Sequence, residues 1–277
     1  NMEKWIFKIK NTKEALNFYN ENGYVGFSDL ISLNQNKILC DAFDSAINKG
    51  VISQGYEDMI AIDDAVYASD EFMSIAKNKK IVDLVKTFLN SESIELQHSK
   101  INSKPISDNG SGLIKWHQDY PFFPHTNHDL LAFGIHLDDE DENSGSLRVI
   151  PRSHINGPLS HCDENGNFTG YCTENNNINE DKSKLLVCPA GTVTIHNCYT
   201  LHQSDPKTNN LKRRLFVNQY RTSDNAQLGG PIWKCTGINI SGNKNKGKIR
   251  FMDGTVIENR GNNGSLYDLF GKLAPKE

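Results

Sequence analysis

The stretch Trp116-His117-Gln118-Asp119-Tyr120 is the segment from which the rest of the chain can be interpreted. A short apolar segment, Leu113 to Trp116, leads into it and predicts a strand that ends at this point. Side chains two positions apart on a strand lie on the same face. His117 and Asp119 can therefore direct an imidazole nitrogen and a carboxylate oxygen to one point. The alternative is a surface turn in which the two side chains only pair with each other.

A second histidine would turn this pair into a metal-binding set. His202 occurs much later, in Leu201-His202-Gln203-Ser204, and is our candidate for the third ligand. Two histidines and one carboxylate with open coordination positions form the ligand set of non-haem Fe(II) oxygenases. We therefore expect His117, Asp119 and His202 to bind one metal ion. His196 is a rival for the position of His202.

Composition narrows the class of protein. The 277 residues, of which 37% are hydrophobic and 23% charged, are sufficient for one large β-barrel or sandwich domain with long polar loops. The formal net charge of −4 disfavours a nucleic-acid-binding role. The chain has no apolar run of about 18 residues and no signal-peptide pattern, so we expect no membrane segment and a cytoplasmic location. Six cysteines without a Cys-x-x-Cys pair are expected to be reduced thiols.

The hydrophobic periodicity changes near residue 90. Residues 1–90 predict mostly helical support, with helices expected over 12–22, 32–49 and 69–90 and a strand over 24–27. Residues 91–221 predict short strands, which indicates a mainly β fold with helices packed on one side. Strands are expected over 94–102, 113–116, 130–137, 147–150, 185–187, 192–196 and 214–220. Residues 222–277 are expected to be irregular apart from a helix over 265–272, and 1–277 to form a single domain.

The alternating strand over 94–102 and the polar segment over 160–184 are informative about a cavity. Ile94, Leu96, His98, Lys100 and Asn102 would share one face, and polar side chains along an inward face predict a lined cavity. Residues 160–184 have few large apolar side chains. They are expected to form either a lid-like insert over the site or a surface loop that never approaches it. His161 within them is expected to be exposed.

In order and spacing, several motifs resemble the phytanoyl-CoA dioxygenase family of Fe(II)/2-oxoglutarate oxygenases, which includes ectoine hydroxylase. The similarity extends over about residues 94–221 and rests on His98 to Pro105, Trp116 to Asp119, Phe123 to Asn127, Ser144 to His154, Pro189 to Gly191, His202 to Ser204, and Arg213. It implies a double-stranded β-helix, a jelly-roll or cupin-like barrel. Gly145-Ser146-Leu147 and Pro151-Arg152-Ser153-His154 depart from the common family pattern, which leaves the substrate open.

The resemblance also implies a cosubstrate site. Iron would bind 2-oxoglutarate and O₂ at its open positions, and a buried arginine would pair with the distal carboxylate of 2-oxoglutarate. Arg213 has the family spacing from His202, whereas its neighbour Arg214 would point to the opposite face. Ser204, Lys104 and Asn102 are the further candidates for contacts with 2-oxoglutarate.

Substrate would lie beside the iron. The candidate lining residues, each of which could equally be core or surface, are His98, Tyr120, Phe122, Phe123, Arg148, Asn218 and Arg221. The expected activity is hydroxylation of an unactivated C–H bond of a small-molecule metabolite, with succinate and CO₂ as co-products. Desaturation, epoxidation or cyclisation are alternatives within the class, and halogenation is disfavoured because Asp119 occupies the position of a halide.

Two readings from other classes remain open: a non-catalytic jelly-roll ligand-binding or sensor protein, and a cupin-type isomerase or hydrolase. The expected partner is a small molecule, without nucleic acid or membrane, in a monomer or homodimer.

Overall fold

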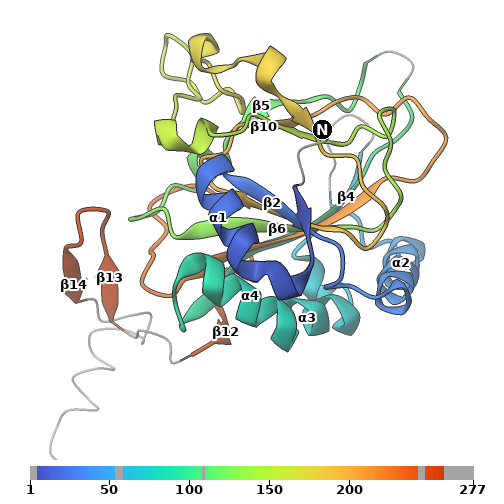
Figure 1. The fold of residues 1–277 in the computed structure, drawn as a ribbon, viewed down its shortest axis with the longest axis horizontal. Coiled ribbons are helices and arrows are strands. Elements are labelled where there is room, and N and C mark those ends of the chain that lie inside the picture. Colours follow the sequence, from blue (N-terminus) through green and yellow to red (C-terminus); the bar gives the residue numbers. More distant parts are fainter. Residues whose placement is uncertain (1–4, 54–58, 108–109, 243–246, 259–277) are drawn as a thin grey trace, which may run out of the picture.

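The main sheet forms the centre of the molecule in this computed structural model, which describes residues 5–53, 59–107, 110–242 and 247–258 (Figure 1). Its strands follow the order β1-β2-β9-β6-β11-β4-β12, and β3 pairs with another part of β4. Their bounds are β1 Ile6–Phe7, β2 Tyr24–Phe27, β3 Ile60–Asp63, β4 Ile94–Ser103, β6 Leu130–His136, β9 Val193–Asn197, β11 Arg214–Thr222 and β12 Ile238–Ser241. The central pairs β9–β6, β6–β11 and β11–β4 are antiparallel.

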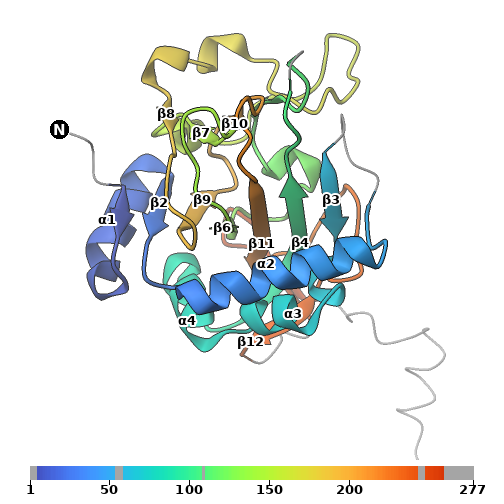
Figure 2. The ribbon, with the colours of Figure 1, turned by 90° about the vertical axis from the view of Figure 1, so that its right-hand side faces the viewer.

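A smaller sheet faces the main one. It contains β5 Ile114–His117, β10 His202–Ser204, β7 Leu147–Val149 and β8 Lys184–Leu185, in that order. Figure 2 shows β7, β8 and β10 on one side of the main sheet and the helices over 33–48, 70–76 and 79–89 on the other. Two opposed antiparallel sheets with helices outside one of them are the arrangement expected from the change in periodicity.

Four α-helices precede β4: α1 Thr12–Asn22, α2 Leu33–Asn48, α3 Asp70–Ala76 and α4 Lys79–Leu89. Ser32 and Gln35 form a reciprocal capping box at the start of α2, with bonds of 3.2 and 3.0 Å between each side chain and the other residue's backbone N–H. The segment 69–90 is divided because the Asn78 side chain accepts from the Lys80 N–H and caps a new helix. Short 3-10 helices span Ile9–Asn11, Ala65–Tyr67, Tyr120–Phe122, Ser153–Asn156, Asn175–Asn177 and Glu180–Lys182.

The helices pack their apolar faces against the outer face of the main sheet. This contact buries side chains from both layers: Leu39, Phe43, Phe72, Ile81 and Val85 from the helices, and Phe27, Ile101, Phe133 and Phe216 from the strands. Phe72 and Phe216 contact each other across the layer, with ring centroids 5.0 Å apart. Each such side chain contributes about 1.5–3 kcal/mol when fully buried. The outer face of the sheet is therefore the hydrophobic core, and the inner face remains available for a cavity.

β4 departs from the alternation expected for it. Gln219 of β11 is opposite His98, but the next residue, Tyr220, is opposite Leu96, so β4 contains an extra residue at Gln97. This β-bulge changes the face to which side chains point. Ile94 and Leu96 consequently lie in the helical core, whereas His98, Lys100 and Asn102 line the inner cavity. The prediction of one shared face for all five residues is therefore wrong. Its three polar residues do line the cavity, as predicted.

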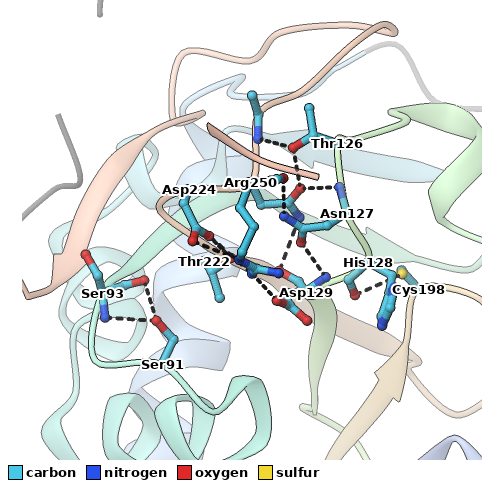
Figure 3. A network of polar contacts seen from close by, with 12 residues as sticks. Ser91, Ser93, Thr126, Asn127, His128, Asp129, Cys198, Thr222, Asp224 and Arg250 are labelled. Atoms are coloured by element: carbon cyan, nitrogen blue, oxygen red, sulfur yellow. Dashed lines mark hydrogen bonds and ion pairs between the residues drawn. The ribbon is translucent and has the colours of Figure 1, made fainter. Parts of the chain in front are cut away.

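The segment after β11 is more ordered than expected. β12 joins the main sheet beside β4, and β13 Lys248–Arg250 pairs with β14 Val256–Glu258. Arg250 attaches this hairpin to the loop before β6 and to the segment after β11 (Figure 3). Its guanidinium bonds Asp129 and Asp224, and its carbonyl accepts from Asn127 at 2.9 Å. The predicted helix over 265–272 lies outside the described residues.

No helix in the described part of the chain combines the length and the apolar character needed to cross a bilayer.

Candidate metal centre

Strand pairing brings the two expected histidine ligands together. His117 is the last residue of β5, His202 is the first residue of β10, and the two are directly opposite each other in the antiparallel register. Asp119 lies beyond the strand, in the turn that starts the Tyr120–Phe122 helix, with φ −70° and ψ −38°. The expectation that strand alternation alone aligns His117 with Asp119 is therefore wrong in its mechanism. A strand end followed by a tight turn produces the same convergence.

The three side chains form a compact donor set. One ligand atom from each of His117, Asp119 and His202 lies within 4.8 Å of the other two. Asp119 Oδ1 is 3.8 Å from His202 Nε2, and the two imidazole centroids are 4.1 Å apart. Asp119 and His202 are buried, at 8% and 6% exposure. Two nitrogens and one carboxylate oxygen at this separation, shielded from water, fit an Fe(II)-type ion.

Backbone carbonyls fix the orientation of both imidazoles. The Nδ1 atom of His117 is 2.7 Å from the Lys115 carbonyl, and that of His202 is 2.9 Å from the Thr200 carbonyl. A carbonyl only accepts, so each Nδ1 carries the proton and each Nε2 is left with a lone pair directed into the site. Burial lowers the pKa of His117 to about 4 and that of His202 well below its usual value. Both rings are thus neutral, as metal ligands must be.

His196 contacts the carboxylate rather than joining the donor set. Its Nε2 donates to Asp119 Oδ2 at 3.1 Å from β9, on the opposite sheet. Burial alone would raise the pKa of Asp119, but the adjacent His202 and His196 hold that pKa well below its usual range. Outer residues of this kind orient a carboxylate ligand. His196 therefore leaves Asp119 Oδ1 as the oxygen nearest to His202.

Gln118 and His161 hold the turn between the two ligands, a role that the sequence did not indicate. The Gln118 side chain donates to the carbonyls of Gly157 and Tyr199 and accepts from the Leu159 N–H. His161 Nε2 accepts from the Gln118 N–H at 3.0 Å. His161 is only 2% exposed, so its predicted exposure is wrong. The segment after residue 157 folds back under the ligand turn and buries this ring.

An inner compartment of about 80 Å³ extends from the three ligands toward Arg213. All four expected cosubstrate residues line it: Asn102, Lys104, Ser204 and Arg213. Arg213 is 3% exposed and immediately precedes β11. Arg214 instead points to the outer face, where it pairs with Asp138 at 2.7 Å and with Asp44 of α2 at 3.2 Å. The structure therefore directs Arg213 into the compartment and Arg214 toward the helices.

The buried acid Glu140 contacts the guanidinium of Arg213. Arg213 Nε is 3.5 Å from Glu140 Oε1, and the same oxygen is 2.7 Å from His136 Nδ1. The side chains of Glu140 and His136 are fully buried. Burial would lower the pKa of His136, but the Glu140 charge dominates and raises that pKa to about 10. This cluster of two cations and one anion retains a net positive charge beside the compartment.

Lys104 lines the inner compartment and also links distant segments of the chain. Its ammonium donates to the carbonyls of Gly112, Ser204 and Asp205, at 2.7, 3.0 and 2.5 Å. These bonds join the segment before β5 to the end of β10. The contact of Lys104 with 2-oxoglutarate stays a prediction.

An outer compartment of about 680 Å³ shares His117 and Asp119 with the inner one but is not lined by Arg213. His98, Phe122 and Phe123 line it, as predicted. The other four predicted substrate contacts lie elsewhere. Tyr120 donates to the His125 carbonyl, Arg148 pairs with Asp205, Asn218 is buried on the core side of β11, and Arg221 pairs with Glu95. For Asn218 the reason is strand parity, because Val217 and Gln219 on either side of it face the inner compartment.

Two further residues of the outer compartment were not among the predicted substrate contacts, although Lys100 lies on the strand face that was predicted to line a cavity. Trp233 stacks on His98 with ring centroids 3.6 Å apart, and Lys100 lines both compartments. Lys100 shares its strand parity with His98 and Asn102, so the sequence contained a signal for it. The sequence contained no such signal for Trp233, because this residue belongs to a loop that reaches the cavity only through tertiary packing.

The polar segment 160–184 contacts both the site and the core. Thr169, Gly170 and Tyr171 line the outer compartment. Elsewhere the segment is attached: Cys172 and Ile178 pack in one cluster with Trp116, whose indole N–H donates to Glu180 at 2.9 Å. It thus has more anchors than its composition suggested, and only 169–171 lie at the cavity.

Comparison with known proteins agrees with this geometry. Residues 19–215 match the family described as phytanoyl-CoA dioxygenase (PhyH). The chain belongs to the phytanoyl-CoA dioxygenase family. A curated relative from Stutzerimonas stutzeri, named a probable alpha-ketoglutarate-dependent hypophosphite dioxygenase, is 38% identical over 159 residues. That match covers 56% of this chain and 54% of the relative, so the chain aligns with about half of the relative's length.

Solved structures of this family's fold superpose over most of the chain. The alpha-ketoglutarate-dependent carbocyclase SnoK from nogalamycin biosynthesis has a TM-score of 0.70 at 18% identity, covering 86% of this chain and 96% of SnoK. EctD from S. alaskensis, solved with 2-oxoglutarate and 5-hydroxyectoine, has a TM-score of 0.66 at 18% identity, covering 81% and 84%. The predicted family and the predicted double-stranded β-helix are both confirmed.

Proposed function

We propose that this chain is an Fe(II)- and 2-oxoglutarate-dependent dioxygenase that hydroxylates a small molecule. The observation that carries the proposal is the convergence of His117, Asp119 and His202 at the junction of two compartments, with buried Arg213 in the inner one. A non-catalytic binding protein has no need for three converging metal donors, two of them buried, and a cupin-type hydrolase has no need for Arg213. Family membership and the names of the similar proteins support the same cofactors.

In this proposal His117, Asp119 and His202 hold Fe(II), which supplies oxidation of the substrate by O₂ coupled to decarboxylation of 2-oxoglutarate to succinate. Arg213 binds the distal carboxylate of 2-oxoglutarate through its terminal nitrogens, since Glu140 contacts its Nε side. Ser204 follows His202 on β10 and lines the same compartment, where its hydroxyl can donate to that carboxylate. The protein thereby contributes ligation, orientation and exclusion of water.

The outer compartment is the proposed substrate site, because it adjoins His117 and Asp119 and is not lined by Arg213. Hydroxylation is the proposed outcome, and desaturation, epoxidation or cyclisation would use the same residues. Because the relative from Stutzerimonas stutzeri is named a probable hypophosphite dioxygenase, hypophosphite is the first substrate to test. Its expected product is phosphite. A small molecule is accordingly the proposed partner.

The decisive experiment measures succinate formed from 2-oxoglutarate by the purified protein with Fe(II), ascorbate and O₂. We expect succinate to form, to require Fe(II), and to be lost in His202→Ala. Substrates that fit the outer compartment should increase the rate and appear with one added oxygen atom by mass spectrometry. If the protein binds Fe(II) and 2-oxoglutarate but forms no succinate with any candidate substrate, a non-catalytic sensor protein would be favoured. Turnover without 2-oxoglutarate would favour the cupin-type hydrolase or isomerase.

A further inference from the structure

The outer compartment has a cation on the wall next to the metal ligands. Lys100 lies on the cavity face of β4 between His98 and Asn102, is half-buried, and lines both compartments. Its charge contributes to the lowered pKa values of His117 and Asp119, after the larger effects of burial and of their nearer neighbours. Within the described part of the chain its ammonium has no hydrogen bond or ion pair, unlike that of Lys104.

The acid nearest to Lys100 in the sheet is directed elsewhere. Asp63 of β3 is opposite Lys100 in the antiparallel register, where a cross-strand ion pair would be ordinary. Its carboxylate instead lies 3.5 Å from His98 Nε2, and this contact with His98 lowers the pKa of Asp63, with a smaller contribution from the charge of Lys100. Asp119, the other acid lining the cavity, accepts a hydrogen bond from His196 and belongs to the metal donor set. A half-buried ammonium that faces a cavity without a hydrogen-bonded or ion-paired partner among the described residues favours an anionic ligand.

The remaining walls define the rest of that ligand. Phe122, Phe123 and Trp233 line the compartment with Tyr171, so part of its wall is aromatic. A volume of about 680 Å³ falls within the range of small-molecule sites, which are mostly apolar with a few polar groups that fix orientation. A second lysine, Lys115, also lines the compartment; it is exposed and lies over the Tyr171 ring, 4.4 Å from its centroid. Lys115 therefore has a partner that Lys100 lacks.

We propose that the substrate carries an oxyanion group, and that Lys100 binds this group and so places the neighbouring bond beside the metal ligands. This inference rests on the proposed function and adds the substrate class to it. Lys100 supplies binding and orientation only. Its oxyanion partner can be an inorganic phosphorus oxyanion or the acidic group of an organic molecule whose apolar part contacts the aromatic walls.

The test is calorimetric binding to the protein loaded with Fe(II) and 2-oxoglutarate in the absence of O₂. The probes are hypophosphite, benzoate and benzamide, the last being the neutral counterpart of benzoate. We expect the wild type to bind at least one anion more tightly than benzamide, and Lys100→Met to weaken that anion about tenfold or more. Lys100→Arg should restore much of the affinity, and Lys115→Met should change it less than threefold. Higher salt should weaken anion binding to the wild type.

The outcomes separate the two proposals. Anion affinities that are equal to that of benzamide, or unchanged in Lys100→Met, would overturn the role of Lys100. So would a Lys100→Met variant whose main defect is weaker 2-oxoglutarate binding, since Lys100 would then be a cosubstrate contact. Tight binding of hypophosphite with weak binding of benzoate would identify an inorganic oxyanion as the ligand. Tight binding of benzoate with weak binding of hypophosphite would identify an organic acid. Both results support the inference. Failure of the wild type to bind Fe(II) or 2-oxoglutarate at all would instead contradict the proposed function.

Discussion

Arg213 and Arg214 are adjacent residues with opposite environments. Arg213 faces the inner compartment beside Glu140, and Arg214 is bound by Asp138 and Asp44 on the helical side. We predict that Arg213→Ala weakens 2-oxoglutarate binding about a hundredfold, because a buried carboxylate loses a bidentate, charge-assisted partner worth about 2–3 kcal/mol. Arg214→Ala should lower stability and leave the affinity within a few-fold. Calorimetric titration of both variants with 2-oxoglutarate measures these affinities. A large loss in Arg214→Ala with little change in Arg213→Ala would show that Arg214 binds the cosubstrate.

Glu140 is the buried acid between Arg213 and His136. We predict that Glu140→Gln lowers the free energy of unfolding by about 3 kcal/mol, because it leaves two buried cations without their counter-charge. His136 should then lose its raised pKa of about 10 and become neutral near pH 7, which can be followed by NMR. The matched control is Glu142→Gln, at an exposed position two residues later, which should change stability by less than about 0.5 kcal/mol. Equal stabilities of the two variants in urea would contradict the assigned role of Glu140.

At the scale of elements, the segment 160–184 divides into an anchored part and a cavity-lining part. Residues 169–171 line the outer compartment, whereas Cys172, Ile178 and Glu180 are attached through Trp116. We predict that 169–171 act as a cover over bound ligand, since closure keeps water from the reaction. Hydrogen exchange should slow there only when both 2-oxoglutarate and a substrate are present, while 172–180 stays unchanged. Fast exchange at 169–171 under all conditions would make this segment a surface loop.

The elements also show where the sequence was informative. Periodicity located the helices and most strands of the main sheet, because each has one face buried in the same core. It failed at the bulge in β4, since an inserted residue changes side-chain parity without changing composition. It also missed β12, whose four residues pair with β4 only after the chain has crossed the sheet.

At the scale of the whole molecule, the metal site depends on long-range pairing. The sequence identified His117, Asp119 and His202 as candidates, but only the β5–β10 register places the two histidines opposite each other. It favoured His202 over His196 as the third ligand, but it could not show that the two lie on different sheets with ring centroids 4.5 Å apart. Nor could it foresee the use of Lys104 by backbone carbonyls or the approach of Trp233 to His98. Such contacts arise from packing between segments distant in sequence, where local patterns carry no information.

The central claim, that His117, Asp119 and His202 bind Fe(II), is tested most directly by equilibrium Fe(II) binding without O₂. The wild type should bind one Fe(II) per chain, and His117→Ala, Asp119→Ala and His202→Ala should each lose stoichiometric binding. His196→Gln should still bind one Fe(II), with affinity reduced about ten- to a hundredfold, because His196 only orients Asp119. Retained stoichiometric binding in His202→Ala together with its loss in His196→Gln would contradict the account and make His196 the ligand.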